Sequence, residues 1–300
     1  MTSEKIYTMK TVPSEEHLSM GSVSCAGCGA LLILRYALKV LGKNTYLVTA
    51  TGCGAVIMQM GVPKVPHIHP LFENGPAIAS GIDSALKVQG KRDKVNILVF
   101  AGDGATADIG LSSLSGAVER DDKMIYICYD NESYMNTGVQ RSSTTPKYAL
   151  TTTTPKGKKI SGEEHALSLS KNVAEMMVAQ GCKYVATASP AYPFDLMTKI
   201  ERAKEIDGVS YIHVLSPCPP GWGHDTRITI KLAKLAVLTG YFLLWEQKMG
   251  KRTYQHLPKR LIPIEEYLKL QRRFTDVLSD ETKLKEYQDY INEKFARCWS

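Results

Sequence analysis

The feature that most constrains the fold is an alternation of short, almost wholly apolar runs with segments of helical periodicity. Residues 95–100 (VNILVF) and 124–129 (MIYICY) are typical of parallel strands that helices cover on both faces. Residues 30–41 repeat leucine every three or four positions, as one face of a helix does. The alternation predicts an α/β fold with a doubly wound, mostly parallel sheet. The other expected strands are residues 46–50, 183–188 and 209–215, and the other expected helices are residues 75–88, 109–120 and 194–203.

The strand pattern stops after Pro217, and the end of the chain is expected to be helical. We therefore divide the chain into a domain of residues 1–257 and a C-terminal helical arm, 258–300, that packs on the core or on a partner. The threonine-rich stretch 136–164 interrupts the alternation and predicts a long, functional loop. One face of the expected arm carries Ile264, Tyr267, Leu268, Phe274 and Leu278.

Charge and hydrophobicity exclude several classes of protein. The chain has 37 Lys and Arg against 30 Asp and Glu, a net charge of +7, but the basic residues are scattered and form no stripe for nucleic acid. No apolar stretch reaches the roughly 18–20 residues of a membrane span. We therefore expect neither nucleic acid nor a membrane as a partner. Residues 1–16 mix both signs of charge and lack the apolar core of a secretion signal, which predicts a cytoplasmic protein.

Four of the seven cysteines lie in turns rich in glycine or proline. Cys25 and Cys28 form a Cys-x-x-Cys pair, Cys53 stands in Thr-Gly-Cys-Gly, and Cys218 in Pro-Cys-Pro-Pro-Gly. Such turns let the backbone fold closely around an iron–sulfur cluster and donate hydrogen bonds to its sulfur atoms. The spacing alone fits structural zinc as well, or thiols without any metal. The remaining three are expected to be buried thiols: Cys128, Cys182 and Cys298.

Polar residues follow two neighbouring strands at the point where each strand ends. Gly102-Asp103-Gly104 comes after the strand 95–100, and Asn131 comes shortly after the strand 124–129. Glycine lets the chain approach a phosphate closely, and the oxygens of Asp103 and Asn131 are hard ligands of the kind that Mg²⁺ prefers. Both lie at the carboxyl edge of the expected sheet, where open α/β sheets bind ligands. The pair therefore predicts a magnesium and diphosphate site.

Longer motifs around these residues resemble a known family. The stretches GDGATADIGLSSLSGAVER and YDNESYMNTGVQRSSTTP, together with CAGCGA, TGC and SPCPPGW, are similar to the β subunits of 2-oxoacid:ferredoxin oxidoreductases of the pyruvate synthase type. The resemblance extends from about residue 20 to residue 274. It implies the thiamine diphosphate-binding form of the doubly wound fold, with thiamine diphosphate, Mg²⁺ and a [4Fe–4S] cluster as cofactors.

The resemblance also implies how the diphosphate is held. Asp103, Asn131 and the backbone carbonyl of Ser133 would be the Mg²⁺ ligands. Gly102 and Gly104 would let the diphosphate approach the backbone. These five positions together make up the expected magnesium and diphosphate site.

The implied reaction is the coenzyme A-dependent, reversible oxidative decarboxylation of a 2-oxoacid, with pyruvate favoured and ferredoxin as the electron acceptor. Asn136 would be the catalytic residue that faces the reacting thiazolium and the substrate, and Thr137 would also contact the cofactor. The cluster nearest the cofactor would be bound by Cys25, Cys28, Cys53 and Cys218.

The implied enzyme is a hetero-oligomer with α-, γ- and δ-type subunits. Thiamine enzymes need a glutamate to activate the cofactor, and we interpret the one candidate, Glu73, as structural, so that a partner subunit would supply it. Residues 54–71 look shorter and less aromatic than in pyruvate-type members, which leaves oxalate, branched-chain and aryl 2-oxoacids open as substrates. More distant alternatives are a non-redox thiamine diphosphate decarboxylase and a zinc-stabilised binding module.

Overall fold

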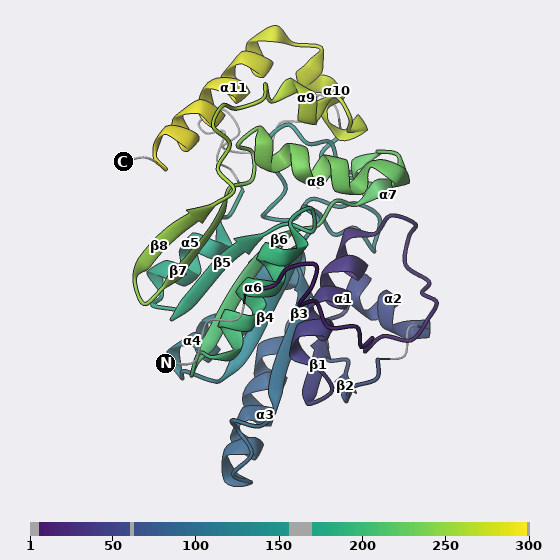
Figure 1. The fold of residues 1–300 in the computed structure, drawn as a ribbon. Helices are drawn as coiled ribbons and strands as arrows, with labels where there is room; N and C mark the ends of the chain where they lie inside the picture. The colour runs from purple at the N-terminus through teal and green to yellow at the C-terminus, as the bar shows by residue number, and fades with distance from the viewer. Residues whose placement is uncertain (1–5, 61–62, 156–169, 299–300) are drawn as a thin grey trace.

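One eight-stranded sheet organises the chain, in a computed structural model that describes residues 6–60, 63–155 and 170–298 (Figure 1). The strands lie in the order β2-β1-β3-β4-β6-β5-β7-β8. Pairing is parallel from β2 to β5, whereas β7 pairs antiparallel with both β5 and β8. The predicted doubly wound, mostly parallel sheet is confirmed. The strands are β1 Thr45–Thr49, β2 His67–Ile68, β3 Asn96–Gly102, β4 Met124–Asp130, β5 Tyr184–Ala188, β6 Val209–Leu215, β7 Leu244–Lys248 and β8 Lys251–Gln255.

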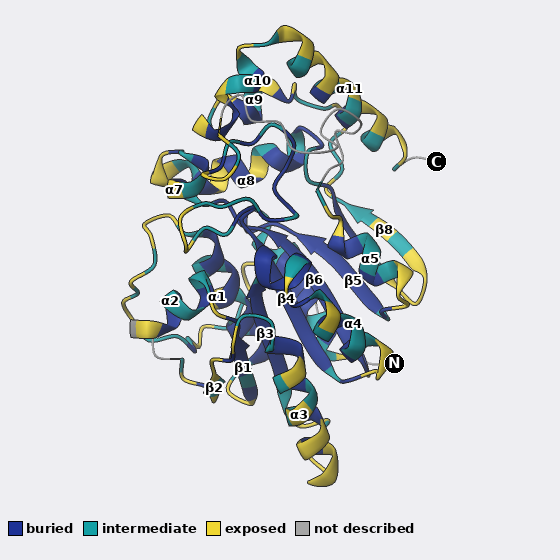
Figure 2. Cartoon of the chain, turned by 180° about the vertical axis from the view of Figure 1, so that it is seen from behind, coloured by how far each residue is buried: buried dark blue, intermediate teal, exposed yellow. Residues whose placement is uncertain are grey.

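Helices cover both faces of the sheet, and Figure 2 shows the central strands as buried. Along β3, Leu98 and Phe100 face a core shared with α1 and α6, whereas Ile97 and Val99 face a second core shared with α3, α4 and α5. This division explains why the central strands are apolar at nearly every position: each face buries its own set of side chains. The helices of these two layers are α1 Gly29–Leu41, α2 Cys53–Met60, α3 Gly75–Val88, α4 Leu111–Glu119, α5 Val173–Ala179 and α6 Pro193–Lys204.

The expectation that the sheet ends at Pro217 is wrong, because β7 and β8 extend it. The two strands form a hairpin whose turn residues, Met249 and Gly250, both have positive φ, at 48° and 80°. The hairpin lies at the edge of the sheet, so β8 has no buried residue and reads as a polar segment. An edge strand needs no continuous apolar run, and the pattern that reveals the central strands is therefore missing here.

The helices after β6 pack together beyond the carboxyl end of that strand, at the top of Figure 1. The expected C-terminal arm is present as several short helices and one long one, and its Ile264, Tyr267, Leu268 and Phe274 are buried as expected. They share a third core with Trp222, on the other side of the boundary proposed at residue 257. That boundary stays a prediction. The helices are α7 Pro219–Trp222, α8 Thr229–Leu238, α9 Glu265–Leu268, α10 Thr275–Leu278 and α11 Glu281–Ala296.

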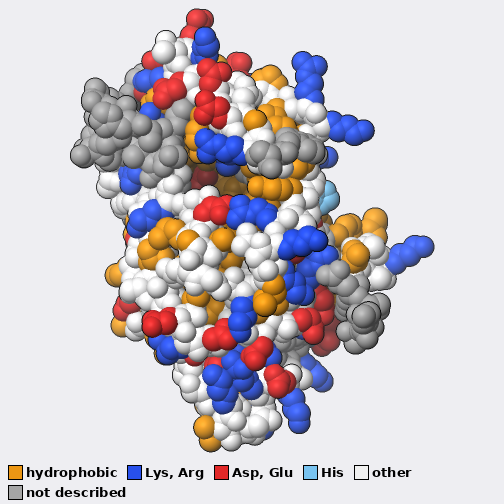
Figure 3. All heavy atoms as spheres, turned by 90° about the vertical axis from the view of Figure 1, so that its left-hand side faces the viewer, with side chains coloured by type: hydrophobic (Ala, Val, Ile, Leu, Met, Phe, Trp, Pro, Cys, Tyr) orange, Lys and Arg blue, Asp and Glu red, His pale blue; other side chains and the backbone are white. Residues whose placement is uncertain are grey.

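The expected functional loop, 136–164, is described as far as residue 155, and its remaining part lies outside the described residues. Within the described part, no helix combines the length and the apolar character that a membrane crossing requires. Figure 3 shows one face of the molecule, on which Lys and Arg side chains are interspersed with Asp and Glu. On this face the charge distribution agrees with the scattered basic residues of the sequence.

Candidate active site

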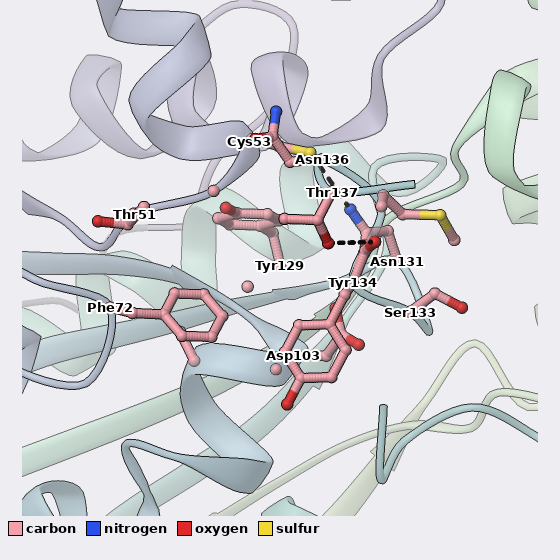
Figure 4. A pocket seen from close by; sticks show the side chains of 15 residues that line it. Thr51, Cys53, Phe72, Asp103, Tyr129, Asn131, Ser133, Tyr134, Asn136 and Thr137 are labelled. Atoms are coloured by element: carbon pink, nitrogen blue, oxygen red, sulfur yellow. Dashed lines mark hydrogen bonds between the residues drawn. The ribbon is translucent and has the colours of Figure 1, made fainter. Parts of the chain in front are cut away.

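A pocket lies at the carboxyl ends of β1, β3 and β4, the edge at which the sequence places its polar residues (Figure 4). Gly102 and Tyr129 are register partners, so the residues that follow them, Asp103 and Asp130, emerge side by side. Every residue predicted to bind the cofactor or magnesium lines this pocket, as do the predicted cluster ligand Cys53 and several residues that the predictions omitted. The lining residues are Thr51, Gly52, Cys53, Phe72, Gly102, Asp103, Gly104, Ala105, Tyr129, Asn131, Ser133, Tyr134, Met135, Asn136 and Thr137.

The three predicted magnesium ligands converge. One terminal atom of the Asn131 side-chain amide lies 2.9 Å from Asp103 Oδ1 and 2.9 Å from the Ser133 carbonyl oxygen. If that atom is the nitrogen, it donates hydrogen bonds to both; if it is the oxygen, three oxygens face one another and need a cation. Adjacent ligands of an octahedral Mg²⁺, each at about 2.0–2.1 Å, are about 2.9 Å apart. The spacing of the donor set therefore fits magnesium.

The electrostatics of Asp103 also favour a cation. Its carboxyl group is almost fully buried, and its Oδ2 accepts hydrogen bonds from Ser142 (2.5 Å) and Thr144 (3.1 Å). Thr144 is also bonded to Asp130 Oδ1 (2.9 Å). Burial first, and then the charge of Asp130, raise the pKa of Asp103 well above its usual value. A divalent ion would remove this cost of holding negative charge in a buried site.

Glycine is needed where the chain begins its helix beside the pocket. A Cβ at Gly104 would lie 2.4 Å from Cε1 of Tyr134, a ring whose hydroxyl donates to Asp108 Oδ2 at 2.7 Å. The following turn, Gly104–Asp108, is π-helical, and Thr106 donates its hydroxyl proton to the Gly102 carbonyl (2.7 Å). Glycine at position 104 therefore lets the Tyr134 ring lie directly against the backbone at this helix start.

Three of the four predicted cluster ligands lie at helix starts. Cys28 is the residue before α1, Cys53 is the first residue of α2, and Cys218 is the residue before α7. Amide groups that are free at the start of a helix carry partial positive charge, which favours an anionic sulfur. Cys25, the fourth, is exposed.

The two loops that carry these cysteines pack against each other. The Gly29 amide donates to the Pro217 carbonyl (3.3 Å), and Thr229 donates its hydroxyl proton to the Gly27 carbonyl (2.8 Å). Gly27 has a φ of 75°, and a Cβ there would lie 2.5 Å from the Thr226 carbonyl oxygen. Contacts between residues about 200 positions apart thus bring the first and the last cysteine motif together.

The thiols of this group influence one another. Burial raises the pKa of Cys53 to about 12, with further contributions from Cys218, Cys28 and Cys25. Burial also raises the pKa of Cys218 to about 12. Among the described His, Cys, Asp and Glu side chains, no three could share a single metal ion. That finding concerns one ion only; in a four-iron cluster each cysteine binds a different iron.

Three cysteines were predicted not to bind the cluster. Of these, Cys128 and Cys182 are buried, as expected, whereas Cys298 is only half-buried. The prediction for Cys298 is therefore wrong in this respect: it follows α11 near the end of the chain, and its sulfur packs at the margin of a core. The conclusion that none of the three belongs to the site stays a prediction.

Several pocket residues escaped the sequence predictions. Phe72 and Tyr134 face each other across the pocket, with ring centroids 5.9 Å apart, and the Tyr129 hydroxyl accepts from the Gly54 amide (2.8 Å). Tyr134 and Met135 lie in the stretch YDNESYMNTGVQRSSTTP, between the predicted site residues Ser133 and Asn136. Their position there could have identified them as pocket residues. Glu73 is not among the lining residues, and its backbone carbonyl accepts from Ser113 (2.8 Å).

Comparisons with known proteins identify the family to which the chain belongs. Residues 26–214 match the model of the family described as "Thiamine pyrophosphate enzyme, C-terminal TPP binding domain". The chain is 50% identical over 284 residues to the pyruvate synthase subunit PorB of Methanothermobacter thermautotrophicus, covering 93% of this chain and 97% of that protein. The chain belongs to the family of 2-oxoacid:ferredoxin oxidoreductase β subunits. The resemblance read from the motifs is thereby confirmed.

Other similar proteins are named after different 2-oxoacids. The ketoisovalerate oxidoreductase subunit VorB of Pyrococcus furiosus is 42% identical over 304 residues, covering 98% of this chain and 96% of that protein. A solved structure, the 2-oxoglutarate:ferredoxin oxidoreductase from Magnetococcus marinus, has a TM-score of 0.59 at 21% identity and covers 93% of this chain and 98% of its own. At that identity the similarity concerns the fold alone.

Proposed function

We propose that this chain is the cofactor-bearing β subunit of a cytoplasmic pyruvate synthase. It would bind thiamine diphosphate with Mg²⁺ and a [4Fe–4S] cluster, and would take part in the coenzyme A-dependent, reversible oxidative decarboxylation of pyruvate, with ferredoxin as electron acceptor. One observation carries the proposal: one end of the Asn131 amide contacts Asp103 and Ser133, and the other end lies 4.0 Å from Cys53 Sγ. Asn131 therefore lies between the expected magnesium site and the expected cluster, so an electron would need to move only a short distance from the cofactor to the cluster.

Five residues would hold Mg²⁺ and the diphosphate of the cofactor. Asp103, Asn131 and the Ser133 carbonyl would hold Mg²⁺, and the backbone at Gly102 and Gly104 would lie against the diphosphate. When bound, thiamine diphosphate supplies an electron sink for decarboxylation and the cluster accepts single electrons.

Two further residues would act at the pocket itself. Asn136 lines it and would donate an amide proton to the substrate oxygen, which stabilises charge that develops there. Thr137 also lines the pocket and would contact the cofactor.

The cluster would be bound by Cys25, Cys28, Cys53 and Cys218. Their mutual effect on the pKa of Cys53 supports this set, because thiolates that repel one another are stabilised by a positively charged metal centre. Burial raises the pKa of the Cys28 thiol. Hydrogen bonds from the backbone amides of Leu31 and Ala30 to its sulfur act in the opposite direction and lower that pKa. Hydrogen bonds of this kind would stabilise the anionic cluster.

Pyruvate is the substrate that the comparisons favour. Pyruvate synthase subunits reach 50% and 45% identity, in M. thermautotrophicus and in Methanocaldococcus jannaschii, against 42% for the ketoisovalerate oxidoreductase subunit. A branched-chain 2-oxoacid is therefore the second candidate. An assay of the assembled enzyme with pyruvate, 2-oxoisovalerate and 2-oxoglutarate, each with coenzyme A and a viologen dye, separates these possibilities.

A partner subunit is needed to complete the site. The one carboxyl group among the described lining residues is that of Asp103, and no glutamate lines the pocket. We propose that α-, γ- and δ-type subunits assemble with this chain and that one of them supplies the activating glutamate at the mouth of the pocket.

The isolated chain, reconstituted with its cluster, Mg²⁺ and thiamine diphosphate, is expected to turn over at least about 100-fold more slowly than the assembled complex, because it lacks a catalytic acid–base group. Reduction of a viologen dye by pyruvate and coenzyme A measures this. Adding the partner subunits should restore the rate. Turnover of the isolated chain at the rate of the complex would contradict the proposal that the site lies between subunits.

Gly104→Ala is expected to weaken the binding of thiamine diphosphate with Mg²⁺ at least about tenfold, because the new methyl group must displace the Tyr134 ring and with it the neighbouring Ser133 carbonyl. Calorimetric titration of the assembled complex measures the affinity. Gly81→Ala in α3 is the matched control, since a Cβ there meets nothing within 4 Å. Equal affinities of the two variants would show that position 104 does not limit the approach of the cofactor.

A further inference from the structure

The segment that carries two of the proposed magnesium ligands, Asn131–Ser133, is held in place from the far end of the chain. Its middle residue, Glu132, is buried but does not line the pocket. Its carboxylate accepts hydrogen bonds from Tyr241 (2.5 Å) and from Arg273 Nη2 (2.5 Å). Arg273 is 141 positions away in sequence and belongs to the short turn Arg272–Phe274 of the C-terminal arm.

Arg273 is itself fixed in a closely packed position. It is buried, its Nε donates to Gln271 Oε1 (2.9 Å), and its guanidinium lies 3.9 Å from the centroid of the Trp222 ring. Trp222 in turn donates its indole N–H to the Asn131 backbone carbonyl (2.8 Å). Arg273 thus contacts Glu132 directly and the residue before it through Trp222.

The backbone at Glu132 has a conformation that L-residues rarely adopt, with φ at 64°. This reversal lets the side chain of Asn131 and the carbonyl of Ser133, on either side of it, face each other at 2.9 Å and face Asp103 together. The residue at the reversal is a glutamate rather than a glycine, so something must hold it there. Its backbone amide donates to Asp130 Oδ1 (2.8 Å) and its carbonyl accepts from Thr145 (2.7 Å), while Arg273 is the charged group that holds its side chain.

We propose that Arg273 is a positioning residue for the thiamine diphosphate site: its ion pair with Glu132 holds residue 132 in the left-handed conformation, and thereby places Asn131 and Ser133 as magnesium ligands. The inference rests on the proposed function, since it concerns the proposed magnesium ligands. It gives the C-terminal arm a role in cofactor binding, although none of the described residues of the arm lines the pocket.

Two effects follow from loss of Arg273. Arg273→Met leaves the Glu132 carboxylate buried without its ion-pair partner, and it releases the backbone of residue 132. We expect the affinity for Mg²⁺ at saturating thiamine diphosphate to fall at least about tenfold, as on loss of other groups that orient metal ligands. Arg273→Lys keeps the charge but loses the Nε hydrogen bond to Gln271 and the planar contact with Trp222, so its affinity should lie between those of Arg273→Met and the wild type.

Two double variants separate a role in backbone conformation from a role in stability. E132A/R273M and E132G/R273M both remove the unpaired carboxylate, but only glycine adopts a positive φ without cost. Glycine at a left-handed position also stabilises the folded chain relative to alanine, so the two affinities are compared at a temperature at which thermal unfolding shows both double variants to be folded. If Arg273 acts through the left-handed backbone, E132G/R273M should bind Mg²⁺ at least about fivefold more tightly than E132A/R273M under that condition.

The test is a calorimetric titration of Mg²⁺ into the assembled complex, stripped of metal and supplied with thiamine diphosphate, with thermal unfolding measured in parallel. Recovery of affinity in E132G/R273M but not in E132A/R273M supports the proposal. Equal affinities of the two double variants, or an Arg273→Met complex that binds within about twofold of the wild type, overturn it. Asp103→Ala in the same titration tests the proposed function separately. If this variant binds Mg²⁺ with wild-type affinity, the proposed magnesium site is wrong, whatever the role of Arg273.

Discussion

Asp103→Ala is expected to lower the affinity for thiamine diphosphate with Mg²⁺ at least about 100-fold and to leave the iron content unchanged. The carboxylate is the one anionic ligand in the proposed set, and without it the diphosphate charge is poorly compensated in a buried site. Calorimetry of the assembled complex, together with iron analysis of the same sample, measures both quantities. Asp103→Asn, which keeps the shape and removes the charge, should lose most of the same affinity.

The controls for this prediction separate binding from folding. Asp93→Ala removes a carboxylate that is exposed and paired with Lys123 at the surface, and it should bind the cofactor as the wild type does. Asp103→Ala leaves the Ser142 and Thr144 hydroxyls without their carboxylate acceptor, so thermal unfolding of the same sample shows whether the variant is folded. A folded Asp103→Ala variant with wild-type affinity would contradict the magnesium site.

Cys218→Ser is expected to lose most of the iron and the EPR signal of the reduced cluster, whereas Cys182→Ser should keep both. Burial raises the pKa of Cys218, a hydrogen bond from the Gly221 backbone lowers it, and the charges of Cys28 and Cys25 raise it. Cys182 instead has its thiol directed at the carbonyls of Tyr184 (3.4 Å) and Val209 (3.1 Å) inside the core. A serine oxygen is a poor replacement for a thiolate toward iron, but a fair one for a thiol that donates a hydrogen bond.

The remaining cysteines extend this comparison. Serine at Cys25, Cys28 or Cys53 should have the effect of Cys218→Ser, and serine at Cys128 should resemble Cys182→Ser. A full cluster in Cys218→Ser together with its loss in Cys182→Ser would mean that the fourth ligand is wrongly assigned. Zinc in place of iron in the wild-type protein would contradict the cluster altogether.

The central strands and the chemistry at their ends could be predicted from the sequence because their signals are local. A parallel strand covered on both faces must be apolar at nearly every position, as residues 97–101 are, and the loop that follows it carries Asp103. The same holds for β4 and Asn131. Since the carboxyl ends of neighbouring parallel strands meet at one edge, the convergence of Asp103 and Asn131 follows from the pattern.

The tertiary structure alone decided the features that depend on contacts between distant segments. The strands β7 and β8 lie at the sheet edge, where one apolar face or less is enough, and so they carry no continuous apolar run. The contact of Tyr134 with Gly104 and the 4.0 Å separation of Asn131 and Cys53 have no local signature either.

The amino-acid sequence by itself determined the alternating α/β fold, the polar strand ends and the three cysteine motifs, because periodicity, turn chemistry and ligand type are properties of neighbouring residues. Only the tertiary structure decided that Arg273 meets Glu132, the residue between the proposed magnesium ligands Asn131 and Ser133. An ion pair between residues 141 positions apart leaves no pattern along the chain, since either residue alone reads as an ordinary surface charge until burial brings the two together.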